Sequence, residues 1–229
     1  MCDVAQAWEY GTVWRASRFP DYWFYNLVRV ERRCALSALE LVGVADQGLA
    51  GLAHRCLDFD TDPGDLRGEF EALGWRSLRL VVMRHEHTAG LAADHEVEKV
   101  PYEAVRALRV AWHAEEFPGN DAGAYLEQAA QVARLGSAHV FAVLEDDRPV
   151  GFSELKRIGS QGEVASAYVV PERRGRGIGT AVTLAAIRAG RDYDDLFIGA
   201  DDEDRPKHLY ERLGFRAACV STNFLRLPE

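Results

Sequence analysis

The pattern of apolar and polar positions is clearest in the second half of the chain. Apolar residues recur with the helical period in four runs, over residues 101–116, 120–136, 180–190 and 206–214. Strand-like runs lie between these helices, over residues 139–159, 162–170, 195–201 and 216–227. The first of them is a hairpin that turns on the sequence EDDRP. Strands that alternate with helices predict an α/β half with a mixed sheet.

The first half has shorter and less regular runs. Strands are predicted over residues 22–30, 54–60 and 76–83, and a short helix ends at Gly74. Residues 31–46 fit either two short strands or a helix, because their period is ambiguous. The polar segment 84–101 has the weakest pattern of the chain and is the best place for a domain boundary.

Two segments of the chain resemble each other. The sequences EFEALGWRSLRLVVM and HLYERLGFRAACVST both contain a helix, a glycine stop, an aromatic residue and a strand, and Gly74 and Gly214 lie 140 residues apart. A strand that ends in aspartates precedes each segment. The two halves of the chain therefore predict a duplicated unit.

The composition narrows the classes of protein. The chain has 229 residues, 48% of them hydrophobic, and a net charge of −9. This acidic balance argues against nucleic-acid binding and favours a cationic partner. The four cysteines form no CxxC pair, which predicts reduced thiols in a cytoplasmic protein. Neither a signal peptide nor an apolar run of membrane-spanning length is expected.

A glycine-rich loop carries the most specific signal, in the sequence VVPERRGRGIGTAV. It lacks the lysine of a Walker loop, and Thr180 stands where a Rossmann fingerprint has its third glycine. It does satisfy the pattern R-x-x-G-x-G through Arg174, Gly177 and Gly179. Alternate glycines let successive N–H groups turn inward, and the following helix adds partial positive charge. The loop, with Arg173 and Arg176 at its rim, is suited to a pyrophosphate.

The sequences AYVVPERRGRGIGTAV and HLYERLGFR resemble the GNAT superfamily of acetyl-CoA-dependent N-acetyltransferases, and the resemblance covers about residues 96–228. It implies that the strand before the loop splays from its neighbour to pair with pantetheine, and that a backbone N–H near Val169 polarises the acetyl carbonyl. It also implies that Tyr210 protonates the departing thiolate. The implied acetyl-CoA contacts are Ala167, Tyr168, Val169, Arg174, Gly175, Arg176, Gly177, Ile178, Gly179 and Thr180.

The sequence departs from the family pattern in two places. Glu203 stands where members often have an asparagine, seven positions before the tyrosine. The strand ASAYVV also lacks the glutamate that many members use as the general base. An ammonium substrate must lose a proton before it attacks. Glu154 is the predicted base, with Glu163 or a chain of waters as alternatives.

Other chemistry is less well supported by the sequence. The pair His85 and His87, with His95 nearby, has no third ligand at a suitable spacing, so no metal site is expected. GFSEL lacks the elbow of a serine hydrolase. The acidic run DYDDLFIGADDED fits a solvated rim or a funnel for a cationic amine. The aromatic residues near the start of the chain are predicted to build a core or a domain interface rather than a platform for stacking a ligand.

These observations predict two tandem GNAT-like domains in an α/β (α+β) fold: a degenerate one over residues 1–94 and a catalytic one over residues 95–229. At the 140-residue offset Phe70 replaces Tyr210 and Cys34 replaces Arg174, in a segment without glycine. One acetyl-CoA per chain is therefore expected. The predicted activity is direct acetyl transfer to a primary amine by a monomer or homodimer. The alternative is a silent acyl-CoA-binding regulatory module of the same fold.

Overall fold

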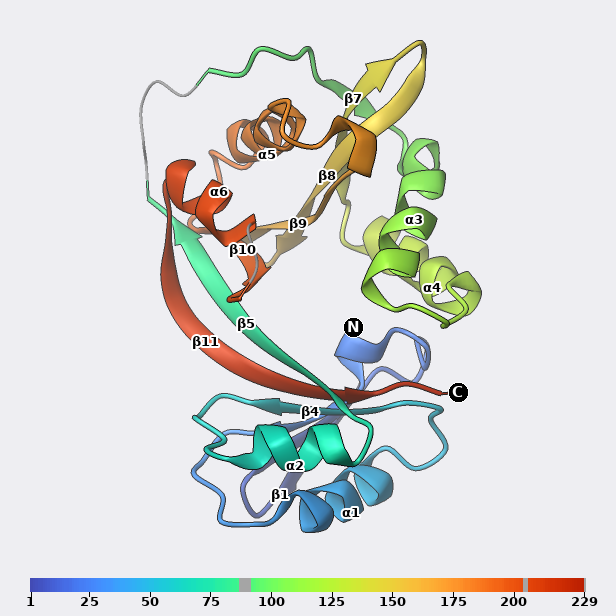
Figure 1. Cartoon of the computed structure of the whole chain (residues 1–229), viewed down its shortest axis with the longest axis vertical. Helices are drawn as coiled ribbons and strands as arrows, with labels where there is room; N and C mark the ends of the chain where they lie inside the picture. The colour runs from blue at the N-terminus through green and yellow to red at the C-terminus, as the bar shows by residue number, and fades with distance from the viewer. Residues whose placement is uncertain (87–91, 204–205, 229) are drawn as a thin grey trace.

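The computed structural model describes residues 1–86, 92–203 and 206–228, and their strands form one continuous sheet (Figure 1). The strands are β1 (Val4–Trp8), β2 (Gly11–Arg15), β3 (Leu27–Val30), β4 (Arg55–Phe59), β5 (Arg76–His85), β6 (Glu98–Val100), β7 (His139–Glu145), β8 (Arg148–Ile158), β9 (Gln161–Val169), β10 (Leu196–Asp201) and β11 (Phe215–Arg226). The α-helices are α1 (Ala38–Gly48), α2 (Leu66–Ala72), α3 (Arg106–Glu116), α4 (Gly123–Leu135), α5 (Ile178–Ala189) and α6 (Pro206–Arg212). Short 3-10 helices are η1 (Trp23–Tyr25), η2 (Tyr102–Val105) and η3 (Pro171–Arg173).

Most elements expected from the sequence are confirmed, including the mixed α/β fold and the hairpin of β7 and β8. The ambiguous segment after β3 contains the helix α1, which Ser37 and Glu40 start with a capping box. Three strands were missed: β1 at one edge of the sheet, β2 beside it, and β6 at the other edge, inside the expected linker. The strand expected over residues 22–30 begins as η1 and becomes extended only at Leu27. Part of the expected linker, residues 87–91, lies outside the described residues, as does His87.

The duplication is visible in the order of elements. At an offset of 140 residues, α1 falls on α5, α2 on α6, β4 on β10 and β5 on β11. Gly74 and Gly214 both adopt left-handed φ values, of 77° and 93°. Such a residue after a helix allows a tight turn into the next strand, and glycine takes this conformation without a Cβ clash.

The two halves exchange strands at the middle of the sheet. The strand order is β1-β2-β3-β4-β11-β5-β10-β9-β8-β7-β6. Thus β11, from the end of the chain, lies between β4 and β5, while β5, from the first half, lies between β11 and β10. In Figure 1 these two long strands run side by side from one lobe to the other. Each half therefore completes its sheet with a strand of the other.

Side chains of both halves also share one buried cluster. Phe19, Trp23 and Cys56 of the first half pack there with Phe117 and Tyr125 of the second. The ring of Trp23 lies edge-on to Phe117, with centroids 5.0 Å apart. The early aromatic residues thus form an interface between the halves, as one of the sequence-based interpretations held. This interface holds α3 beside the start of β5, where Leu78 and Leu80 line the candidate site.

Candidate active site

The glycine loop forms an exposed turn between β9 and α5. Gly175 and Gly177 have φ values of 76° and 85°, in the left-handed region that favours glycine. Gly177 is the N-cap residue of α5, and no side chain caps the helix there. The first N–H groups of a helix have no acceptor within it. The loop therefore offers backbone donors and the positive end of α5 to an anion.

Ion pairs and hydrogen bonds hold the loop from several sides. Arg173 Nε lies 2.6 Å from Glu145 Oε2, and Arg174 Nη2 lies 2.6 Å from Glu115 Oε2. Arg174 Nε also donates to the carbonyl of Val169 at 2.9 Å. The ring of His95 reaches the carbonyl of Arg176 at 2.7 Å. These contacts hold Arg173, Arg174 and the carbonyl of Arg176 around the two glycines of the loop.

The three arginines of the loop therefore differ in their surroundings. Arg173 and Arg174 are paired with carboxylates, whereas the guanidinium of Arg176 has no partner among the described residues. Glu115 also accepts a hydrogen bond from the hydroxyl of Tyr168 at 2.8 Å. Burial, together with this bond, raises the pKa of Tyr168 to about 12. Tyr168 and Arg174 thus brace the loop through Glu115, and Arg176 is the loop arginine available to a ligand.

The strand before the loop splays from its neighbour, as the family resemblance implied. The parallel pairing of β9 with β10 ends at Val164 and Ile198. Beyond it, Ser166 has a φ of 52° in a β-bulge opposite β8. A bulge of this kind bends a strand away from its ladder. The last residues of β9, including Ala167 and Val169, are therefore not paired with β10.

A cavity of about 270 Å³ lies at the splay. Ser166 and Ala167 of β9 line it together with Ile198 and Gly199 of β10, and Tyr210 of α6 closes one side. Tyr210 is largely buried, at 6% exposure. The structure thus brings Tyr210 and Ala167, which lie far apart in the sequence, to one cavity along the strand that leads into the glycine loop. Ile178 is buried behind the loop, in a cluster that Val169 adjoins.

Glu154, the predicted base, lies elsewhere. It is buried on β8, where Arg109 Nη2 lies 2.7 Å from its Oε2 and Lys156 Nζ 3.8 Å from its Oε1. It is not among the described residues that line the cavity. Burial lowers the pKa of Lys156, but Tyr22 and nearby carboxylates outweigh it, so the net shift is upward and Lys156 stays charged. Glu154 is thus flanked by two cations, away from the cavity.

Several residues at the site were not singled out by the sequence. Trp112, Glu116 and Phe117, at the end of α3, line the cavity, as does Phe24 of the first half. Glu203, at the position of the missing asparagine, forms a two-pronged ion pair with Arg67 of α2 at 2.7 and 3.0 Å. These contacts join segments far apart in the chain, so no local sequence pattern predicts them.

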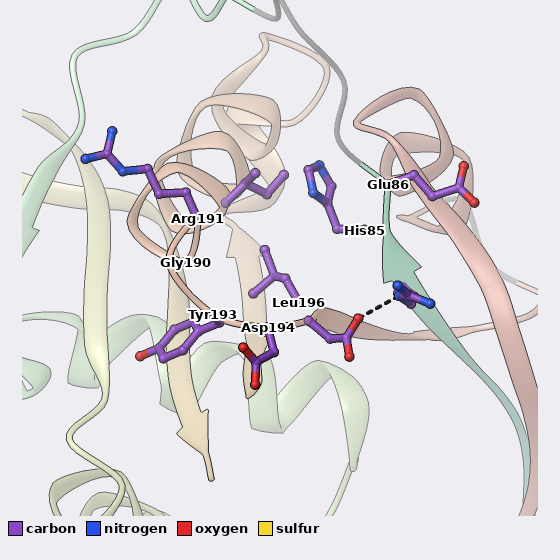
Figure 2. Close-up of a pocket in the computed structure, with 10 residues that line it drawn as sticks. His85, Glu86, Gly190, Arg191, Tyr193, Asp194 and Leu196 are labelled. Atoms are coloured by element: carbon purple, nitrogen blue, oxygen red, sulfur yellow. Dashed lines mark ion pairs between the residues drawn. The ribbon is translucent and has the colours of Figure 1, made fainter. Parts of the chain in front are cut away.

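A larger cavity, of about 440 Å³, lies at the other end of α5 (Figure 2). It is lined by the end of β5 and by Arg191, Tyr193 and Asp194, and an ion pair of 2.7 Å joins Arg84 to Asp195 at its side. The length of α5, about 18 Å at 1.5 Å per residue, separates it from the glycine loop. None of the predicted site residues lines it, so the chemistry is placed at the smaller cavity.

The first half lacks these features at the matching positions. Ser37 and Glu40 cap the start of α1, so the backbone donors there already have acceptors. The parallel pairing of β3 with β4 continues to Val30 and Phe59, the last residues of both strands, and no splay opens. Phe70, in the place of Tyr210, is buried and stacks on Phe224 with centroids 4.2 Å apart. The same elements here form a closed core.

An uncapped, glycine-rich helix start beside a splayed pair of parallel strands is suited to a phosphate-bearing ligand that lies along an open strand. The family model described as "Acetyltransferase (GNAT) family" matches residues 103–215. The chain belongs to the GNAT superfamily, and its fold is a tandem of two GNAT-like halves. Among the described residues no helix has the length and apolar character needed to cross a membrane, and no cluster of side chains is placed to hold a metal ion.

Curated relatives share part of the sequence. The mycothiol acetyltransferase of Rhodococcus jostii (strain RHA1) is 32% identical over 154 residues, covering 60% of this chain and 47% of that protein. That of Clavibacter sepedonicus is 38% identical over 85 residues, covering 35% of this chain and 28% of that protein. The matched regions therefore span about half or less of the length of these relatives.

Solved structures match the fold at low sequence identity. A functionally unknown conserved protein from Staphylococcus epidermidis ATCC 12228 matches 100% of this chain and 96% of its own, with a TM-score of 0.72 at 17% identity. A tandem GNAT protein from the clavulanic acid biosynthesis pathway matches 81% of this chain and 68% of its own, with a TM-score of 0.52 at 16% identity. These likenesses show the fold alone, including its tandem organisation.

Proposed function

We propose that the protein transfers the acetyl group of acetyl-CoA directly to a primary amine of a small molecule or peptide. The observation that carries this proposal is the continuity of one site: the uncapped start of α5, the splay of β9 from β10, and the cavity that Tyr210 closes. The named activity of the curated relatives supports acetyl transfer as well. The predicted cytoplasmic location stays a prediction.

Each part of the site has a role in this proposal. The backbone N–H groups from Gly175 to Thr180, with the guanidinium of Arg176, hold the pyrophosphate. Ala167, Tyr168 and Val169 run along the pantetheine arm. Arg174 acts through Glu115, which it holds against the loop at 2.6 Å. Gly175 leaves open space beside the loop, since a Cβ added there would meet no atom within 4 Å.

The chemical step forms one bond and breaks one bond. The amine nitrogen attacks the thioester carbonyl, the new C–N bond forms, and the C–S bond breaks. Tyr210 gives its hydroxyl proton to the departing thiolate, and a base takes the proton that the amine loses. No described cysteine lines the cavity, so direct transfer is favoured over a covalent enzyme intermediate. Glu154 stays the predicted base, acting through water because it does not line the cavity.

The silent acyl-CoA-binding module is the second candidate. The position of Glu154 favours it, because Arg109 and Lys156 hold the predicted base away from the cavity. Tyr210 at the cavity favours the enzyme. The two candidates predict the same binding of acetyl-CoA and differ only in turnover.

Release of free thiol from acetyl-CoA, measured with a panel of amines, separates the two. The panel includes simple amines, polyamines, a peptide with a free N-terminus and, because the curated relatives are named for mycothiol, the free-amine precursor of mycothiol. We expect amine-dependent thiol release and an acetylated amine in the mass spectrum. Tight acetyl-CoA binding without thiol release from any amine would support the silent module instead.

A further inference from the structure

The charges and rings around the cavity indicate what kind of amine it accepts. Among the described residues that line it, the charged ones are Glu116 and Asp201, both acidic. Aromatic rings of Phe24, Trp112 and Phe117 form much of its wall. A carboxylate attracts an ammonium group, and the faces of aromatic rings attract cations and pack well against apolar groups. The lining thus combines negative charge with an apolar wall.

Glu116 is held in a defined position by the first half of the chain. Arg76 of β5 pairs with it, with Nη2 lying 2.6 Å from Oε1. The same guanidinium donates to the backbone carbonyl of Glu116 and lies over the ring of Phe117, 5.2 Å from its centroid. Within the described residues, the other carboxylate oxygen, Oε2, has no hydrogen-bond partner. One carboxylate oxygen is therefore fixed, and the other is free to accept a hydrogen bond from a ligand.

Two further features add negative potential at the cavity. Glu116 is the last residue of α3, so the negative end of that helix lies at the same place. Asp201 stands at the end of β10, where its Oδ1 accepts the backbone N–H of Glu203 at 2.8 Å. One carboxylate thus comes from α3 and the other from β10. Although Arg76 neutralises charge on Glu116, the carboxylate of Asp201 and the end of α3 leave an excess of negative charge at the cavity.

We propose that the acceptor is a compact primary amine with an apolar or aromatic body, whose ammonium group pairs with Glu116 while the body packs against Phe24, Trp112 and Phe117. This inference rests on the function proposed above and narrows its substrate. The cavity volume of about 270 Å³ is at the lower end for small-molecule sites, which suits a compact ligand. A carboxylate on the ligand would find no cationic lining residue, so free amino acids bind poorly.

Steady-state kinetics with matched acceptors test the inference. We expect kcat/KM for 2-phenylethylamine to exceed that for L-phenylalanine, which adds one carboxylate, and that for spermidine, which lacks an apolar body, by at least about 10-fold each. In Glu116→Gln the KM for 2-phenylethylamine should rise about 10- to 100-fold, the range of a charge-assisted hydrogen bond, while the KM for acetyl-CoA stays unchanged. Equal or better use of the amino acid or the polyamine would overturn the inference and leave the proposed function standing.

A control variant and a binding measurement complete the test. Glu103→Gln removes another exposed carboxylate that pairs with an arginine, Arg134, away from the cavity, and its KM values should match those of the unmodified protein. Calorimetry of 2-phenylethylamine with the CoA-loaded protein reports binding without turnover. If Glu116→Gln weakens the binding of 2-phenylethylamine, the inference is supported even when no thiol is released. The absence of thiol release would overturn the proposed function alone. Unchanged binding in Glu116→Gln would overturn the inference.

Discussion

The backbone of Gly177 gives the sharpest test of the loop. A Cβ added at this residue would meet only His95, at 3.7 Å, which is an ordinary contact, so Gly177→Ala introduces no clash. The difficulty is its φ of 85°, because an alanine in the left-handed region costs about 1–2 kcal/mol. In the proposed complex, acetyl-CoA accepts hydrogen bonds from the N–H groups of the loop and so prevents the exposed residue 177 from relaxing. The strain therefore appears mainly as weaker binding.

The size of the effect follows from that strain. A cost of about 1–2 kcal/mol corresponds to a roughly 5- to 30-fold rise in the Kd for acetyl-CoA. At a fixed ligand concentration well above Kd, the stabilisation of the folded protein by acetyl-CoA should fall by the same free energy. Titration calorimetry gives the Kd, and thermal melts with acetyl-CoA, and with NAD as a ligand that should cause no shift, give the stabilisation.

Gly159 provides a matched control for Gly177. It also has a left-handed φ, of 64°, and open space around its Cβ position, but it lies in the turn between β8 and β9. Gly159→Ala should lower the melting temperature of the free protein and leave the Kd for acetyl-CoA unchanged. If both variants weaken binding equally, or if Gly177→Ala binds like the unmodified protein, the loop does not hold the pyrophosphate in the conformation described here.

Two further predictions concern Tyr210 and the buried His113. Tyr210→Phe should lower turnover by roughly 10- to 1000-fold at nearly unchanged acetyl-CoA affinity, because it removes only the hydroxyl that donates the proton. Unaltered turnover would assign Tyr210 to packing or show that chemistry is not rate-limiting. Burial lowers the pKa of His113, outweighing the nearby Asp121, and neither ring nitrogen has a hydrogen-bond partner among the described residues. Its contribution to stability is therefore fully present above its unfolded pKa of about 6.5 and is lost as the pH falls below that value. Urea unfolding at about pH 8 and pH 5 should show a larger loss of stability for the unmodified protein than for His113→Phe, and equal losses would contradict this role.

Local signals predicted the parts of the structure that depend on local geometry. The glycines of the loop and the stops at Gly74 and Gly214 mark left-handed backbone positions, which few other residues tolerate. The helical and strand periods of the second half are confirmed for the same reason: each buried face repeats within one element. The edge strand β1 was missed because its side chains are mostly exposed, and β2 because its five residues, all buried or half-buried, are too few to give a clear pattern.

The exchange of β5 and β11 could not be predicted from the sequence. The two strands follow the same helix and glycine stop, so each carries the same pattern and either sheet could take either strand. The choice depends on packing between distant segments, as does the placement of Glu116 by Arg76 across 40 residues. That the first half binds no acetyl-CoA stays a prediction, which rests on a loop without glycine and on Phe70, which has no hydroxyl.

The central claim is that two copies of one fold unit form a single working site. Calorimetric titration of the full chain with acetyl-CoA measures it directly, because the number of sites per chain follows from the shape of the curve. We predict one site per chain, since α1 is capped by its own Ser37 and β3 stays paired with β4. Gly177→Ala should weaken that site roughly 5- to 30-fold. Two equivalent sites per chain would contradict the account, as would one site that is indifferent to Gly177.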